Sequence, residues 1–114
     1  MEPDKITIDE LITLIGKLKQ EQFDFVNRDK NIDFLEKHNL SIENEIEAIK
    51  QLNKHDLKEG PVEDDNPNRK HPVWIFIKKI WNIECYIKIK VINHCRVIIV
   101  ISFHETESKG GNTI

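Results

Sequence analysis

One stretch of the chain decides its fold: Glu84-Cys85-Tyr86-Ile87-Lys88-Ile89-Lys90-Val91. Apolar and polar side chains alternate along it, and successive side chains of a β-strand point to opposite faces of the sheet. The pattern predicts a half-buried antiparallel strand. Its outer face would present a phenol and two amines, from Tyr86, Lys88 and Lys90.

Strand patterns also cover residues 73–79 and 97–104, and a brief alternation covers residues 23–25. Helical signals come earlier in the chain. A Thr7-x-x-Glu10 capping box precedes apolar residues at helical spacing, and two further helices are predicted, one ending near Asn39 and one capped by Ser41. We therefore expect an α+β fold, a mainly antiparallel sheet with the N-terminal helices packed on its apolar face. Six residues are predicted to be core: Trp74, Phe76, Ile87, Ile89, Ile99 and Phe103.

The loop that follows Ile92 is predicted from parity. A two-residue turn would mix apolar and polar side chains on both faces, because a one-residue slip of a strand exchanges its faces. A loop with an odd number of residues instead groups the inward isoleucines with Ile99 and Phe103. We predict that register, which brings His104 near Tyr86.

Residues 59–72 contain Gly60, three prolines and polar residues, which is typical of a loop. The length of 114 residues indicates one domain, residues 1–114, with a core over about 7–105 and a flexible tail over 106–114. The N-terminus lacks the pattern of a signal peptide, and no apolar run approaches a membrane span. We expect a cytoplasmic protein with reduced thiols that does not bind a membrane.

The net charge of −3 hides a division of the chain into an acidic and a basic half. Residues 1–65 contain nine Lys and Arg against seventeen Asp and Glu, whereas residues 66–104 contain seven Lys and Arg and one acid, Glu84. A basic sheet face can bind phosphate groups locally. The alternative is that these lysines keep the sheet soluble and block edge pairing, which is the commoner use.

No metal site is expected. Cys85 and Cys95 have no metal-ligand spacing, and a two-metal nuclease would need clustered carboxylates that the basic half lacks. We also expect no cofactor.

The order of elements, together with five short motifs, resembles the MqsR-type toxins of bacterial toxin-antitoxin pairs, which are similar to the RelE-like fold. The motifs are Phe25-Val26-x-Arg28-x-Lys30-Asn31, Leu57-Lys58-x-Gly60-Pro61, Val73-Trp74-x-Phe76, Tyr86-Ile87-Lys88 and Ser102-Phe103-His104-Glu105. The resemblance implies an endoribonuclease that cleaves mRNA without a metal and is neutralised by a cognate antitoxin protein.

By position, the resemblance implies three catalytic residues, Lys58, Tyr86 and His104. His104 stands where the best-known family member has lysine, and Ile75 stands where some members have glutamine. We expect Lys58 to approach the Tyr86–His104 face from the side of the Gly-Pro loop.

Chemistry supports these assignments. Cleavage of RNA by its own 2′-hydroxyl needs a base, an acid for the leaving 5′-oxygen and positive charge for the phosphorane. His104 can exchange a proton near neutral pH, Tyr86 can donate a hydrogen bond or a proton, and the binding of single-stranded RNA is assigned to three cations, Arg28, Lys88 and Lys90.

Each of these residues also has an ordinary structural use. A histidine at a strand end is more often a surface residue than a catalyst, and Lys58 could simply be a cation at a helix terminus. The alternative function is therefore a catalytically silent domain of similar fold that binds RNA or a protein partner. The remaining histidines have no convergent spacing and receive no role: His38, His55, His71 and His94.

Overall fold

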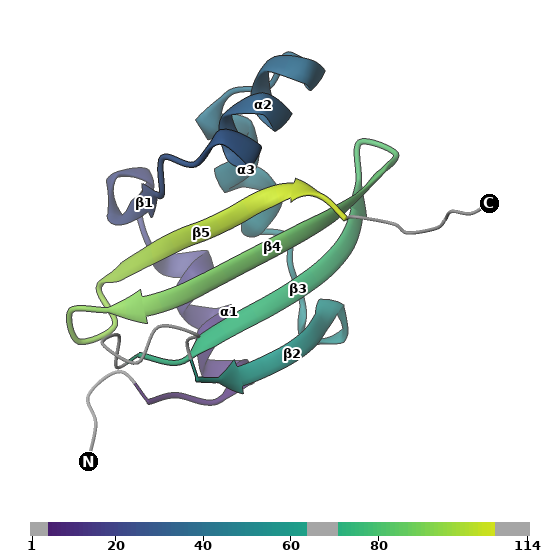
Figure 1. The fold of residues 1–114 in the computed structure, drawn as a ribbon. Helices are drawn as coiled ribbons and strands as arrows, with labels where there is room; N and C mark the ends of the chain where they lie inside the picture. Colours follow the sequence, from purple (N-terminus) through teal and green to yellow (C-terminus); the bar gives the residue numbers. More distant parts are fainter. Residues whose placement is uncertain (1–4, 64–70, 107–114) are drawn as a thin grey trace.

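The computed structural model describes residues 5–63 and 71–106. Three α-helices precede most of the strands (Figure 1). The helices and 3₁₀ turns are α1 (Ile8–Lys17), η1 (Gln20–Gln22), α2 (Asp29–His38), α3 (Ile42–Ile49) and η2 (Lys54–Asp56). The strands are β1 (Phe23–Phe25), β2 (Leu57–Val62), β3 (Val73–Ile80), β4 (Ile83–Ile92) and β5 (Val97–Glu105). The predicted tail beyond residue 106 and the centre of the predicted loop, 64–70, lie outside the described residues.

The five strands form one sheet in the order β1-β5-β4-β3-β2. Neighbouring strands are antiparallel except for β1, which pairs with β5 in parallel. Figure 1 shows α1 and α3 behind the sheet and α2 alongside β5, above that side of the sheet in the view, so the face toward the viewer is not covered by any described helix. The expected α+β fold with N-terminal helices on one face is confirmed.

The first helix forms for the reason that the sequence indicates. The Thr7 hydroxyl accepts from the backbone N–H of Glu10 at 3.1 Å, and the Glu10 carboxylate accepts from the backbone N–H of Thr7 at 2.8 Å. This capping box satisfies two N–H groups that the first turn leaves without partners. Leu11 and Ile15 then point into the core. Within the described residues, no helix has the length and apolar character needed to cross a membrane.

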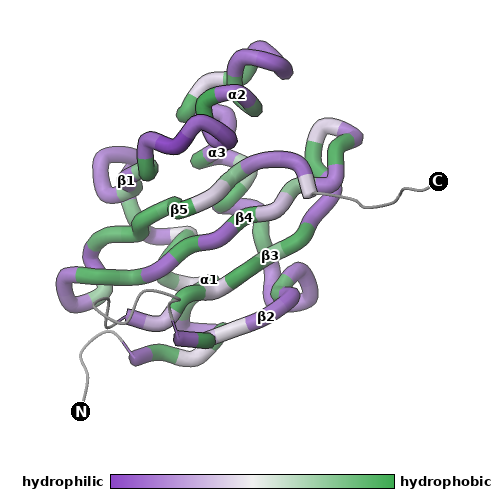
Figure 2. Tube along the Cα trace, viewed as in Figure 1, coloured by the Kyte–Doolittle hydropathy of each residue, from purple (hydrophilic) through white to green (hydrophobic). Residues whose placement is uncertain are grey.

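The core lies between the sheet and the helices. Figure 2 shows hydrophobic segments concentrated in β3, β4 and β5, and mainly hydrophilic ones in α2. Five of the six predicted core residues are buried: Trp74, Phe76, Ile87, Ile89 and Phe103. The sixth, Ile99, is only half-buried, because it pairs with Lys90 on the open face. Ile98 and Val100 occupy the core in its place.

The hairpin between β4 and β5 departs from the predicted register. Its loop, residues 93–96, has four residues, because Ile92 pairs with Val97. The predicted odd-numbered loop is therefore wrong. A β-bulge at Ile101 adds one residue to β5 and shifts the register by one. Beyond the bulge, Tyr86 pairs with His104, as predicted.

The first part of the predicted loop is an edge strand. Leu57–Val62 pairs with β3, with register shifts on both sides of Glu59. Gly60 has φ 133, and a Cβ there would lie 2.9 Å from the carbonyl oxygen of Val73. Proline is tolerated on an edge strand because no further strand needs its missing N–H group. The Gly-Pro sequence therefore marks a bulged edge, and the prediction of loop from residue 59 is wrong at this point.

Candidate active site

The open face of the sheet is centred on Tyr86 and His104. Their rings are stacked, with centroids 5.3 Å apart and an interplanar angle of 15°. Directly opposed side chains on antiparallel strands lie close enough for such contacts. A phenol and an imidazole therefore meet on the face that no described helix covers (Figure 1).

The backbone fixes how His104 is oriented. Its Nδ1 lies 2.8 Å from the carbonyl oxygen of Glu105. A carbonyl only accepts, so Nδ1 must be the nitrogen that bears hydrogen, and in the neutral ring the lone pair then lies on Nε2. The geometry assigns this tautomer, in which Nε2 can accept a proton.

Arg28 reaches the same region from the N-terminus of α2. Its Nη1 donates to Ser102 Oγ at 2.9 Å and lies 3.5 Å from the carbonyl oxygen of Ile101. Ser102 pairs with Lys88 and is almost completely buried, with 2% of its surface exposed. The guanidinium of Arg28, which we expected to bind RNA, is held over the bulged part of β5.

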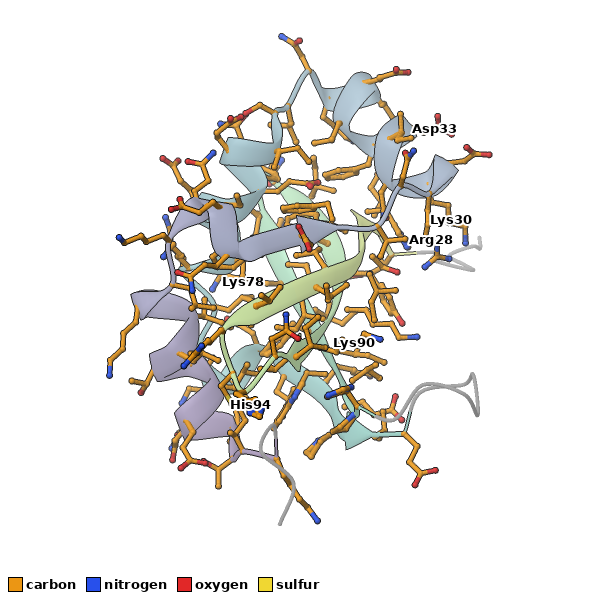
Figure 3. The ribbon with its side chains drawn as sticks, turned by 90° about the vertical axis from the view of Figure 1, so that its left-hand side faces the viewer. Arg28, Lys30, Asp33, Lys78, Lys90 and His94 are labelled. Atoms are coloured by element: carbon orange, nitrogen blue, oxygen red, sulfur yellow. The ribbon has the colours of Figure 1, made fainter. Side chains whose placement is uncertain are left out.

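Lys88 and Lys90 follow Tyr86 along β4 on the same face, because the residues alternate and both are half-buried there. Figure 3 shows Arg28, Lys30 and Lys90 on one side of the sheet, away from α1. Lys78, by contrast, points toward the helices and forms an ion pair with Asp56 at 3.1 Å. The cations of the basic half are therefore divided between the two faces.

Lys58 lies apart from the Tyr86–His104 pair. It is exposed on β2, and β3 separates β2 from β4. Two strand spacings place its backbone roughly 10 Å from that of β4. Along the strand direction, however, Lys58 is close to the level of Lys88. Its neighbour Glu59 pairs with Ile75, and Ile75 pairs with Lys88. The structure thus brings Tyr86, His104, Lys88 and Arg28 together, but leaves Lys58 on the rim.

Asn31 holds the bulge in place. Its Nδ2 donates to the carbonyl oxygens of Ile101 at 3.0 Å and of Val26 at 3.1 Å, and its Oδ1 accepts from the backbone N–H of Phe103 at 3.0 Å. These are groups that β1 cannot pair, because β1 ends at Phe25. Ile32 is exposed, whereas Asn31 is buried.

A second contact ties the end of β5 to α2. Glu105 accepts from Lys37 at 3.0 Å, and its carboxylate lies 3.3 Å from His38 Nε2. Hydrogen bonds from Lys37 and then His38 lower the pKa of Glu105. Sequence reasoning gave His38 no role, and the only signal for one was its place in the last turn of a helix.

A shallow pocket of about 210 Å³ lies next to His104, between α2 and β5. It is lined by Lys30, Asp33, Phe34, Lys37, His104 and Glu105. The lining combines the aromatic ring of Phe34 with acidic and basic side chains. Such a pocket suits a flat polar group beside the histidine.

Within the described ranges, no group of three or more His, Cys, Asp and Glu side chains is placed to hold a metal ion. No protein-family model matches the chain, and a search of curated proteins finds no similar one.

Proposed function

We propose that the protein is an endoribonuclease that cleaves single-stranded RNA, in particular mRNA, without a metal ion. The observation that supports this proposal best is the stacked Tyr86–His104 pair, with Lys88 and Arg28 beside it on an open sheet face. An imidazole with an accepting Nε2, a phenol and two cations match the needs of cleavage by the 2′-hydroxyl.

The proposed step begins with His104. Its Nε2 takes the proton of the 2′-hydroxyl, and the 2′-oxygen forms a bond to the phosphorus. The bond from phosphorus to the 5′-oxygen breaks, and that oxygen takes a proton from the phenol of Tyr86. Lys88 and Arg28 stabilise the extra negative charge of the phosphorane. The products are a 2′,3′-cyclic phosphate and a 5′-hydroxyl.

The test is cleavage of a labelled single-stranded RNA by the purified protein in excess chelator. We expect the stated end groups, and a rate lower by about 10²–10⁴-fold for His104→Ala, the range typical of a general acid or base. Tyr86→Phe should also slow cleavage. His55→Ala is a matched control, since His55 is exposed in η2. Full activity of a His104→Ala, Tyr86→Phe double variant would refute the site, and loss of activity with chelator would refute the mechanism.

The proposal includes an antitoxin that neutralises the enzyme, on the strength of the motif resemblance. Inducible expression of the chain should arrest growth, and co-expression of the adjacent gene should restore it. The His104→Ala variant is the control, because it should not arrest growth. Growth arrest by His104→Ala that equals that of the wild type would contradict an origin in RNA cleavage.

A catalytically silent module that binds RNA or a protein is the second candidate. The position of Lys58 on the rim favours it, because this expected catalytic residue is two strands away from Tyr86 and three from His104. The absence of cleavage, combined with tight binding of RNA, would select this alternative.

A further inference from the structure

A second concavity lies at the β4–β5 hairpin, at the opposite end of the sheet from His104. It has a volume of about 710 Å³. Its lining includes one guanidinium, from Arg96, one carboxylate, from Glu21, and the imidazoles of His71 and His94. The remaining lining residues are Gln22, Asn93 and Val97.

The backbone around this pocket is held in an unusual shape. Asn93, His94 and Cys95 have φ of 55, 56 and 64, so three consecutive residues other than glycine adopt left-handed conformations. Each such conformation is less favourable for an L-residue with a Cβ atom. The side-chain amide of Gln22 donates to the carbonyl oxygen of Arg96 at 2.9 Å, which ties the hairpin to η1. A strained segment fixed by its surroundings is a candidate for function.

The pocket continues the face that contains the candidate active site. Val97, which lines it, pairs with Ile92, and Ile92 follows Lys88 and Lys90 at alternate positions of β4. The six residue steps from Tyr86 to Ile92 span about 20 Å at the rise of a β-strand. In Figure 3, His94 lies at the hairpin end and Lys90 lies between it and Arg28 in height. Lys88 and Lys90 therefore lie between the Tyr86–His104 pair and the hairpin, where Arg96 lines the pocket.

We infer that the hairpin pocket, through His71, His94 and Arg96, binds phosphates of a single-stranded RNA that runs along β4 from the Tyr86–His104 pair. This inference rests on the proposed function and names its substrate as a chain of several nucleotides. A polyanion gains affinity from each cation that replaces a counterion. Lys88 and Lys90 on β4 and Arg96 in the hairpin are spread along the sheet, and such a spread fits an extended backbone rather than a single nucleotide.

The test is the binding of 2′-O-methyl RNA, which cannot cleave itself and so separates binding from catalysis. Two lengths are compared by fluorescence anisotropy, about 4 and about 16 nucleotides, the ends of the usual range of single-strand site sizes. Arg96→Gln should weaken binding of the longer RNA roughly tenfold, the loss of one charged hydrogen bond. It should also reduce the slope of log affinity against log salt by about 0.7. The loss should be larger for the longer RNA than for the shorter one.

Two further variants sharpen the test. Glu21→Gln should tighten binding, because it removes the acidic side chain of the pocket. Lys54→Gln is the matched control: it removes one exposed positive charge at η2, where Lys54 lies 3.9 Å from Asp9 of α1. Circular dichroism spectra should confirm that all three variants fold.

The outcomes separate this inference from the proposed function. If the protein cleaves RNA but Arg96→Gln and Lys54→Gln bind the longer RNA equally well, the hairpin pocket is not a phosphate site. If Arg96→Gln and Glu21→Gln shift the affinity in opposite directions but the protein does not cleave RNA, the pocket is supported and the enzymatic proposal fails.

Discussion

The side chain of Asn31 makes the hydrogen bonds to the bulge at Ile101 that a neighbouring strand would otherwise make. It donates to the Ile101 carbonyl at 3.0 Å and accepts from the backbone N–H two residues later, at 3.0 Å. Because the bulge shifts the β4–β5 register, this contact helps to decide which side chains meet on the open face. His104 faces Tyr86 only beyond this shift.

Replacing Asn31 with alanine should therefore destabilise the protein. Each buried backbone group left without a partner costs about 1–3 kcal/mol. The free energy of unfolding, measured by urea denaturation, should fall by at least one such increment. Asn27→Ala is the control, since Asn27 is exposed and its change should stay within about 0.5 kcal/mol. Equal stability of the two variants would contradict the assigned role.

The buried carboxyl of Glu45 should make stability depend on pH. Only 1% of the residue is exposed, Oε2 has no hydrogen-bond partner among the described residues, and burial raises its pKa to about 8. The folded state holds this proton to higher pH than the unfolded state does. Stability should therefore decline as pH rises from about 4.5 to about 8, with a contribution of up to about 1.4 kcal/mol per pH unit.

Glu45→Gln should abolish that decline, because an amide does not titrate. Urea denaturation at several pH values gives the free energy of unfolding of each variant and shows whether it declines as the pH rises. Glu47→Gln, at an exposed position of the same helix, should leave the decline intact. If the Glu45→Gln variant loses stability with pH as the wild type does, another group is responsible.

The two cysteines should differ in reactivity. Cys85 is fully buried, and burial raises its pKa to about 11, whereas Cys95 is half-buried in the hairpin. The thiolate is the reactive form, so Cys85 should resist a thiol reagent in the native protein. A colorimetric thiol assay should find one fast thiol, which Cys95→Ser removes, and a second one only after unfolding. Fast labelling of Cys85 in the folded protein would show that the core opens readily.

Lys58→Ala should reduce the proposed RNA cleavage less than His104→Ala does, and by less than about tenfold. Lys58 lies on the edge strand with β3 between it and β4, so its charge acts from a distance and through solvent. Steady-state cleavage rates of the two variants make the comparison. A loss as large as that of His104→Ala would mean that Lys58 reaches the phosphate directly.

Much of this structure is encoded locally. The capping box at Thr7 and the alternation along β4 depend on residues close together in the chain, and both are present as predicted. Keeping apolar residues on one face also predicted that Tyr86 and His104 meet, although the odd-numbered loop assumed for that register is wrong.

Other features depend on contacts that no local pattern contains. The four-residue hairpin loop puts Ile98 and Val100 in the core, and a bulge at Ile101 then restores the predicted pairing. That bulge is held by Asn31, about 70 positions earlier in the chain. The burial of Glu45 likewise depends on packing between α3 and the sheet, since its place in the first turn of a helix predicts only exposure to the helix dipole. The periodicity of apolar residues in the sequence indicates which face of a helix or strand a side chain occupies. Only tertiary packing decides which buried polar groups find partners and how far a side chain such as Lys58 lies from the open face.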